Sequence, residues 1–157
     1  MSWPVGMQPF TRVAFSPCQF LLAFSTIAGT NHQHVVRLWD GTNGKIGAEF
    51  PLGARCLGMA FSNDGQTLAI STTHPDNLLT LWRVSDGTKL AAYSQRNDPE
   101  AGTRIFVSPF AATRDLSVAA DATPEGRIRV IDLATGNERW SAQAAAMTVK
   151  ALAFSPD

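Results

Sequence analysis

Residues 58–93, GMAFSNDGQTLAISTTHPDNLLTLWRVSDGTKLAAY, divide into short runs of strand-forming residues separated by turn signals. Each turn contains the Gly, Asn, Asp, Ser or Pro residues that β-turns prefer. The runs cover residues 59–61, 67–72, 78–83 and 89–93. Four such runs within forty residues predict one four-stranded antiparallel meander.

The rest of the chain repeats this pattern. The motifs VAFSP, MAFSN, IFVSP and LAFSP place their serines 46, 46 and 47 residues apart, at Ser16, Ser62, Ser108 and Ser155. A second spacing is independent of the first, because a large residue precedes a turn glycine by five positions at Trp39, Trp82 and Ile131. A repeat of this length with a Trp-Asp dipeptide is typical of propeller blades.

The sequence resembles the WD-repeat β-propeller family at RLWD (37–40), TLWR (80–83) and the strands LAFST and LAIST. The resemblance implies structural roles for Trp39, Trp82 and the turn aspartate Asp76. We expect Trp82 to pack between adjacent blades, and Trp39 to do the same on at least one side. The sequence departs from the family pattern at Gln33, Glu125 and Ile131, and no Gly-His pair opens a repeat. The family's Asp-His-Ser-Trp hydrogen-bond network is therefore expected to be incomplete.

We therefore predict an all-β fold in which residues 1–157 form a single partial propeller domain of four-stranded antiparallel meanders, with an incomplete ring. The predicted blades cover about 11–50, 56–93 and 104–142, and residues 148–157 form the first strand of a fourth blade. We expect the chain to be a piece of a longer one; assembly from several copies and an open array are the alternatives. Open blade edges predict self-association.

Two connections look longer than their counterparts. Residues 27–34 exceed what a hairpin requires between the second and third strands of the first repeat. In the third repeat, a first strand at residues 105–108 would be followed by a connection over residues 109–115, about three residues longer than in the other repeats.

Composition limits the classes of partner. The chain has 157 residues, of which 45% are hydrophobic and 17% charged, as in soluble globular domains. Thirteen basic and thirteen acidic residues cancel, which disfavours nucleic acid and anionic membrane surfaces as partners. The apolar run at residues 20–28 is far shorter than the roughly 18 residues of a spanning helix. Cys18 and Cys56 lack metal or redox spacing and are expected to be free thiols, which favours a cytoplasmic location.

No catalytic motif is present, so we predict that the chain is not an enzyme and holds no cofactor or metal. The three histidines, His32, His34 and His74, could approach one rim, but a metal site wants a fourth ligand, and we interpret them as solvated loop residues. Residues 131–140, IDLATGNERW, look like the Asp…Thr-Gly…Trp docking motif of quinoprotein propellers, and occur once.

The predicted function is that of a non-catalytic scaffold for protein–protein interaction. In a four-stranded meander alternate connections emerge at the same end, and the irregular polar loops gather at one of them. The candidate contact residues in these loops are Asn31, His32, His34, His74, Asn77, Arg96, Asn97, Asp98 and Glu100. The alternatives are a quinoprotein-like (PQQ-type) propeller fragment and a regulatory or sensory propeller appended to a larger enzyme chain.

Overall fold

The fold was analysed in a computed structural model, which describes residues 12–73, 78–94, 109–122, 126–144 and 149–155. These residues form three four-stranded antiparallel sheets, and the strands of each sheet follow one another in chain order. The strands are β1 (Val13–Phe15), β2 (Leu21–Ala28), β3 (Gln33–Asp40), β4 (Lys45–Pro51), β5 (Cys56–Phe61), β6 (Thr67–Thr72), β7 (Leu78–Arg83), β8 (Lys89–Ser94), β9 (Phe110–Ala112), β10 (Val118–Ala122), β11 (Arg127–Asp132) and β12 (Glu138–Gln143).

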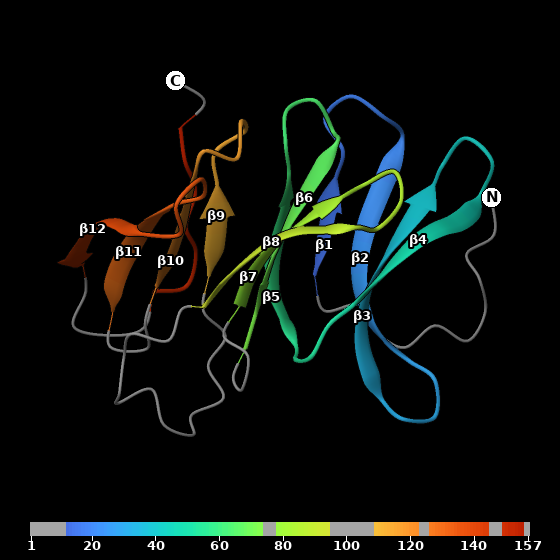
Figure 1. Cartoon of the computed structure of the whole chain (residues 1–157), viewed down its shortest axis with the longest axis horizontal. Helices are drawn as coiled ribbons and strands as arrows, with labels where there is room; N and C mark the ends of the chain where they lie inside the picture. Colours follow the sequence, from blue (N-terminus) through green and yellow to red (C-terminus); the bar gives the residue numbers. More distant parts are fainter. Residues whose placement is uncertain (1–11, 74–77, 95–108, 123–125, 145–148, 156–157) are drawn as a thin grey trace.

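The sheets are blades 1, 2 and 3, and Figure 1 shows them side by side in chain order. The first strand of blade 2, β5, contacts the first strands of both neighbouring blades, β1 and β9, and these three are the innermost strands. Arg12, just before β1, donates from Nε to the carbonyl oxygen of Leu57 at 2.6 Å. The predicted all-β fold of antiparallel meanders is confirmed, and the three sheets do not close into a ring. The described residues include no helix, and therefore none long and apolar enough to cross a membrane.

The core lies between the blades because both faces of a blade carry apolar side chains. Between blades 1 and 2, Val36, Leu38 and Phe50 pack against residues of β5 to β7 that include Leu68 and Trp82. The alternate residues of β6 and β7, among them Ala69 and Leu79, pack instead against blade 3. Successive strand residues point to opposite faces, so one strand supplies both interfaces.

Trp82 lies between blades 1 and 2, as the repeat spacing predicts. It is 5% exposed, and its ring meets Phe50 edge-on with centroids 5.6 Å apart. Its indole Nε1 donates to Thr80 Oγ1 at 2.8 Å, and this hydroxyl donates to the Ile70 carbonyl oxygen at 3.2 Å. The threonine two residues earlier on the same strand thus satisfies the indole N–H without the family's longer network.

Trp39 differs from Trp82. It pairs with Leu22 across β2 and β3 and therefore lies on the face of blade 1 opposite to the Val36 and Leu38 side chains. There it is half-buried against Phe20, with ring centroids 5.9 Å apart. Trp39 therefore does not pack between blades 1 and 2, contrary to the expectation for that interface.

The third repeat begins later than the serine spacing predicts. Residues 110–112 form β9 and pair with β10, so the connection predicted over residues 109–115 is wrong. The turn after β9 is built on Thr113, whose Oγ1 accepts from Val118 N and donates to Val118 O at 3.1 Å each. Ser62 makes the same two bonds to Thr67 in blade 2, so Thr113, and not Ser108, is its counterpart. Residues 104–108, where blade 3 was predicted to begin, lie outside the described residues.

The prediction of a long loop at residues 27–34 is also wrong, since β2 and β3 continue into it. Ala28 pairs with Gln33 and Ile27 with His34, which leaves a four-residue turn. Predicted Asp76 lies outside the described residues. Residues 149–155 have no strand partner in the described part of the chain, and their assignment to a fourth blade stays a prediction.

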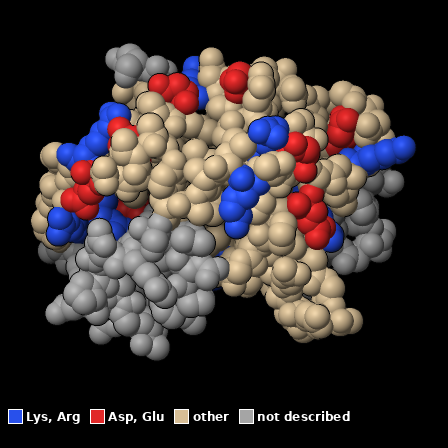
Figure 2. Space-filling view, in the orientation of Figure 1, with Lys and Arg blue, Asp and Glu red and all other residues tan. Residues whose placement is uncertain are grey.

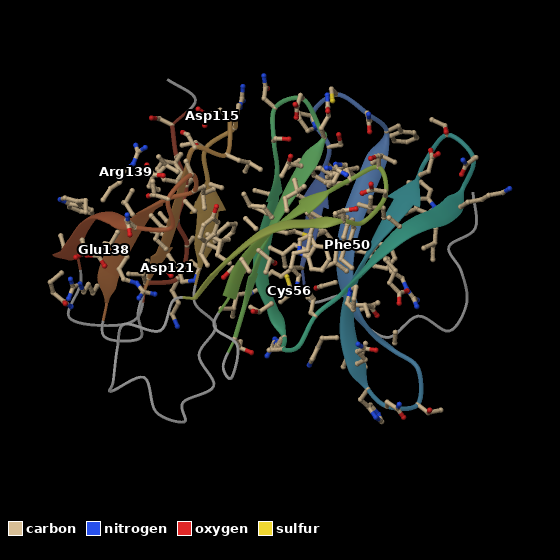
Figure 3. The ribbon with its side chains drawn as sticks, in the orientation of Figure 1. Phe50, Cys56, Asp115, Asp121, Glu138 and Arg139 are labelled. Carbon is tan, nitrogen blue, oxygen red and sulfur yellow. The ribbon has the colours of Figure 1, made fainter. Side chains whose placement is uncertain are left out.

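Cys56 and Asp121 are buried inside the blades (Figure 3). Cys56 is buried and free, and burial raises the pKa of its thiol to about 12, so it remains protonated at neutral pH. Cys18 is exposed, and both cysteines are free thiols, as predicted. Asp121 is buried on β10 and accepts two hydrogen bonds from Arg129 of β11, from Nε at 2.9 Å and from Nη2 at 2.7 Å.

Candidate interaction surface

The β2–β3 hairpin lies at the end of blade 1 opposite the short turns, and its strands stay paired up to a four-residue turn (Figure 1). Its strands have eight residues each, whereas β6 and β7 have six each and β10 and β11 have five and six. Gly29 and His32 adopt positive φ, 67° and 51°, which closes the turn between them. Glycine accepts this conformation without strain, whereas a β-carbon makes it unfavourable for His32.

Three of the predicted contact residues lie on this hairpin. Asn31 and His32 are exposed at its tip, and His34 is half-buried where the hairpin joins the blade. The carbonyl oxygen of His34 accepts from Leu52 N at 2.9 Å, which ties the hairpin base to the segment that follows β4. No Lys, Arg, Asp or Glu lies in residues 27–34, so the tip offers the hydrogen-bonding groups of Asn31, His32 and Gln33 on a backbone held by strand pairing.

The other predicted contact residues, His74, Asn77, Arg96, Asn97, Asp98 and Glu100, lie outside the described residues. The grouping of these loops with the hairpin therefore stays a prediction. In the ranges that the structure does describe, no group of three or more His, Cys, Asp or Glu side chains could hold a metal ion.

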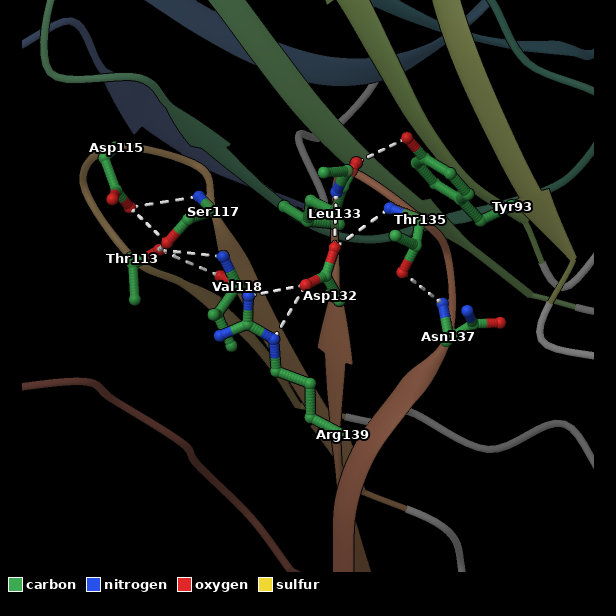
Figure 4. A network of polar contacts seen from close by, with 11 residues as sticks. Tyr93, Thr113, Asp115, Ser117, Val118, Asp132, Leu133, Thr135, Asn137 and Arg139 are labelled. Atoms are coloured by element: carbon green, nitrogen blue, oxygen red, sulfur yellow. Dashed lines mark hydrogen bonds and ion pairs between the residues drawn. The ribbon is translucent and has the colours of Figure 1, made fainter.

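The opposite end of the blades carries turns built on aspartates. Asp132 Oδ1 accepts from the N–H groups of Ala134 and Thr135 at 2.8 and 2.9 Å, and its Oδ2 accepts from Arg139 Nε at 2.8 Å (Figure 4). Asp115 Oδ1 accepts from Ser117 N at 3.0 Å. These bonds favour the ionised carboxylate and lower the pKa of both aspartates to about 2. The largest contribution at Asp132 comes from the Arg139 side chain, and the largest at Asp115 comes from the Ser117 N–H.

These lowered pKa values predict that the fold loses stability in acid. A carboxylate with a folded-state pKa near 2 and an ordinary unfolded-state pKa of 3.8 stabilises the fold above about pH 4 and ceases to do so as the pH falls toward 2. We expect the urea midpoint of the wild-type chain to fall over this range, and that of Asp132→Asn to fall less. If the urea midpoints of the two proteins fell equally with pH, the Asp132 carboxylate would make no contribution to the loss of stability in acid.

The quinoprotein-like segment is explained by the same turn chemistry. Asp132, Thr135 and Arg139 bond within the turn, where Asn137 N also donates to Thr135 Oγ1 at 3.3 Å, and Gly136 adopts a φ of 76°. Trp140, the residue that matches the docking tryptophan, is 54% exposed on β12. The motif therefore forms a turn whose tryptophan packs into no neighbouring blade among the described residues.

A hollow of about 430 Å³ lies where the innermost strands meet. Residues from β1, β5 and β9 line it together with residues 150–152, and they include two cations, Arg12 and Lys150. The sequence does not indicate this hollow, because its lining residues come from four separate segments of the chain and none of these segments carries a motif. The order of the blades could have indicated the hollow, because the first strands of propeller blades lie around the central axis.

Charges are mixed over the molecular surface. Figure 2 shows basic and acidic side chains interspersed on one face. Ion pairs join charged side chains on neighbouring strands or within turns, such as Arg37 with Glu49 at 2.6 Å and Arg83 with Asp86 at 3.0 Å. The described surface therefore shows no broad field of one sign on that face.

Comparison with known proteins identifies the fold and nothing finer. No family model matches the sequence, and no curated protein matches it. Among solved structures 884 chains match, so the fold is too widespread to indicate one activity. One of them is the Cps50 (Swd1) β-propeller domain of Myceliophteria thermophila, with a TM-score of 0.71 and 18% sequence identity. The match covers 94% of this chain and 46% of that one. The chain therefore has the fold of a partial WD-repeat β-propeller.

Proposed function

We propose that this chain is a non-catalytic protein-binding module that contacts its partner through the tip of the β2–β3 hairpin. The observation that carries the proposal is the extension of this hairpin beyond the corresponding strands of the other blades. Function on rigid folds is commonly carried by such projecting connections.

The chemistry of the tip supports a protein partner. Asn31, His32 and Gln33 are exposed donors and acceptors, and Ile27 and Ala28 are half-buried beside them. This mixture of polar groups with a small apolar area suits a peptide or protein surface, and residues 27–34 contain no Lys or Arg to pair with a phosphate group. The side chains are held by eight paired residues on each strand, so little conformational entropy is lost on binding.

The test replaces the side chains of the tip and leaves its backbone unchanged. We expect Asn31→Ala/His32→Gly/Gln33→Ala to lower recovery of a cross-linked partner by about tenfold or more, corresponding to about 1.4 kcal/mol of binding free energy. Glycine at position 32 keeps the positive φ without strain, so the hairpin should form as before. Recovery is measured by quantitative mass spectrometry after cross-linking in the source cells.

The matched control is Gln66→Ala, in the first turn of blade 2 at the opposite end. The Gln66 side chain is exposed, and its backbone N–H donates to Asp64 Oδ1 at 3.0 Å, a bond that the substitution leaves in place. We expect Gln66→Ala to recover as much partner as the wild type. Equal recovery by the hairpin variant and the wild type would refute the hairpin as the contact site.

A further inference from the structure

The turn between β3 and β4 contains the one Asn-Gly pair of the sequence, Asn43 followed by Gly44. Gly44 N donates to the Asp40 carbonyl oxygen at 2.8 Å, and Gly44 adopts a φ of 71°. Asn43 is exposed, and both ends of its side-chain amide are bound. Its Nδ2 donates to Asp40 Oδ2 at 2.7 Å, and its Oδ1 accepts from Lys45 N at 2.8 Å. Asp40 therefore binds the amide groups of both residues.

An Asn-Gly pair is chemically reactive because no side chain shields the glycine nitrogen. This nitrogen attacks Cγ of the asparagine, so that an N–Cγ bond forms and the Cγ–Nδ2 bond breaks. Ammonia leaves and takes the glycine N–H proton with it. Water then opens the resulting succinimide at one of its two carbonyl carbons, which gives aspartate or isoaspartate. A hydrogen bond from the glycine N–H and an asparagine side chain fixed by other bonds both oppose the attack.

The corresponding turn of blade 2 shows when a carboxylate fits in place of the asparagine. There Gly87 N donates to the Arg83 carbonyl oxygen at 3.0 Å. The residue before this glycine is Asp86, whose Oδ1 accepts from Thr88 N at 2.9 Å, in the manner of Asn43 Oδ1. Its Oδ2 lies 3.0 Å from Arg83 Nη1. A carboxylate at this position is thus paired with a cation, whereas in blade 1 the residue at the place of Arg83 is an aspartate.

We propose that Asn43 is a deamidation site that the closed turn protects, and that deamidation then prevents the turn from closing again. The reaction occurs only when the turn opens, because the closed turn binds the Gly44 N–H and fixes the Asn43 amide. The aspartate product places a second carboxylate against that of Asp40, where Nδ2 donates before the reaction. The isoaspartate product adds one carbon to the main chain inside the turn, which displaces Gly44 N from the Asp40 carbonyl oxygen.

The first test measures aspartate and isoaspartate at position 43 by peptide mapping and mass spectrometry, after incubation of the purified chain at neutral pH. We expect formation in the folded chain to be about tenfold or more slower than in the urea-unfolded chain, because opening the turn breaks several hydrogen bonds. Asp40→Ala removes the acceptor of Asn43 Nδ2 and should raise the rate in the folded chain.

The matched control is Asp86→Ala, which removes the aspartate from the corresponding turn of blade 2 and should leave the rate at Asn43 unchanged. Equal rates in the folded and unfolded chains would overturn the proposal, as would an unchanged rate in Asp40→Ala. A rate raised as much by Asp86→Ala would also overturn it, because unfolding of the whole chain would then control the reaction.

The second test measures urea midpoints of the product and of the pair found in blade 2. Asn43→Asp reproduces the aspartate product and should lower the midpoint more than Asn43→Ser, which loses the amide donor and adds no charge. In an Asp40→Arg background, Asn43→Asp recreates the pair of Arg83 with Asp86 and should raise the midpoint. A loss of the same size in both backgrounds would show that repulsion from Asp40 does not hold the turn open, and would overturn the proposed irreversibility.

Discussion

Trp82→Ala should lower the free energy of unfolding by about 3–5 kcal/mol. The substitution empties a site between blades 1 and 2 that the indole fills while only 5% exposed, in edge-on contact with Phe50. It also leaves the Thr80 hydroxyl, which accepts from the indole Nε1, without that donor. A domain is commonly held together by about 5–15 kcal/mol, so the loss should move the urea midpoint clearly, as followed by far-ultraviolet circular dichroism.

Two matched substitutions separate burial from the loss of an aromatic side chain. Trp140→Ala removes an indole that is 54% exposed and should change the urea midpoint little. Thr80→Val keeps the shape of the side chain but removes the hydroxyl, leaving the buried indole N–H unpaired at a cost of about 1–3 kcal/mol. A Trp82→Ala protein as stable as Trp140→Ala would refute the inter-blade position of Trp82.

The repeat spacing predicted the blades well where turn chemistry and strand pattern agree. In blade 2 the predicted strands at residues 67–72 and 78–83 coincide with β6 and β7. The turn at Ser62 was recognised because its serine, aspartate and glycine are all common turn residues. The regularity of this blade made it a sound reference for the others.

The first turn of the third repeat was misplaced because it uses other residues for the same contacts, whereas the later strands of this repeat lie close to their predicted positions. Thr113 replaces the serine, and Leu116 adopts a φ of 52° where blade 2 has Gly65 at 66°. Leu116 is 8% exposed in the core between blades 2 and 3, so packing stabilises a conformation that a search for glycine overlooks. The Ser-Pro pair at residues 108–109 resembled the turn more closely than the true one does.

The candidate site was predicted in part for a related reason. The polar character of Asn31 and His32 is plain in the sequence, but the extension of β2 and β3 follows from pairing that continues through Ile27 and His34. Sequence alone does not separate a long loop from a long hairpin when both contain glycine and asparagine. The contact of Trp39 with Phe20 of its own blade depends on where the turn after β1 places Phe20, and it could be found only in three dimensions.

Gly58→Ala should destabilise the fold by about 1–3 kcal/mol, although strand residues usually gain from a side chain. Gly58 lies on β5, where the innermost strands of blades 2 and 3 touch. A β-carbon at this position would stand 2.7 Å from Cβ of Phe110, an atom that no side-chain rotation can move away. Relief therefore requires β5 and β9 to separate, which would open the contact between two blades.

Gly47→Ala on β4 is the matched control, and it should have the opposite sign. The nearest atom to a β-carbon there is the Leu38 carbonyl oxygen at 4.0 Å, and Gly47 is not among the glycines with positive φ. Alanine should fit without strain and restrict the unfolded chain, raising the free energy of unfolding by about 0.4–1 kcal/mol. Both substitutions add the same methyl group. A urea midpoint below the wild type for Gly58→Ala and above it for Gly47→Ala would therefore support close contact between β5 and β9. Midpoints that moved together would show that β5 and β9 are not in contact at Gly58.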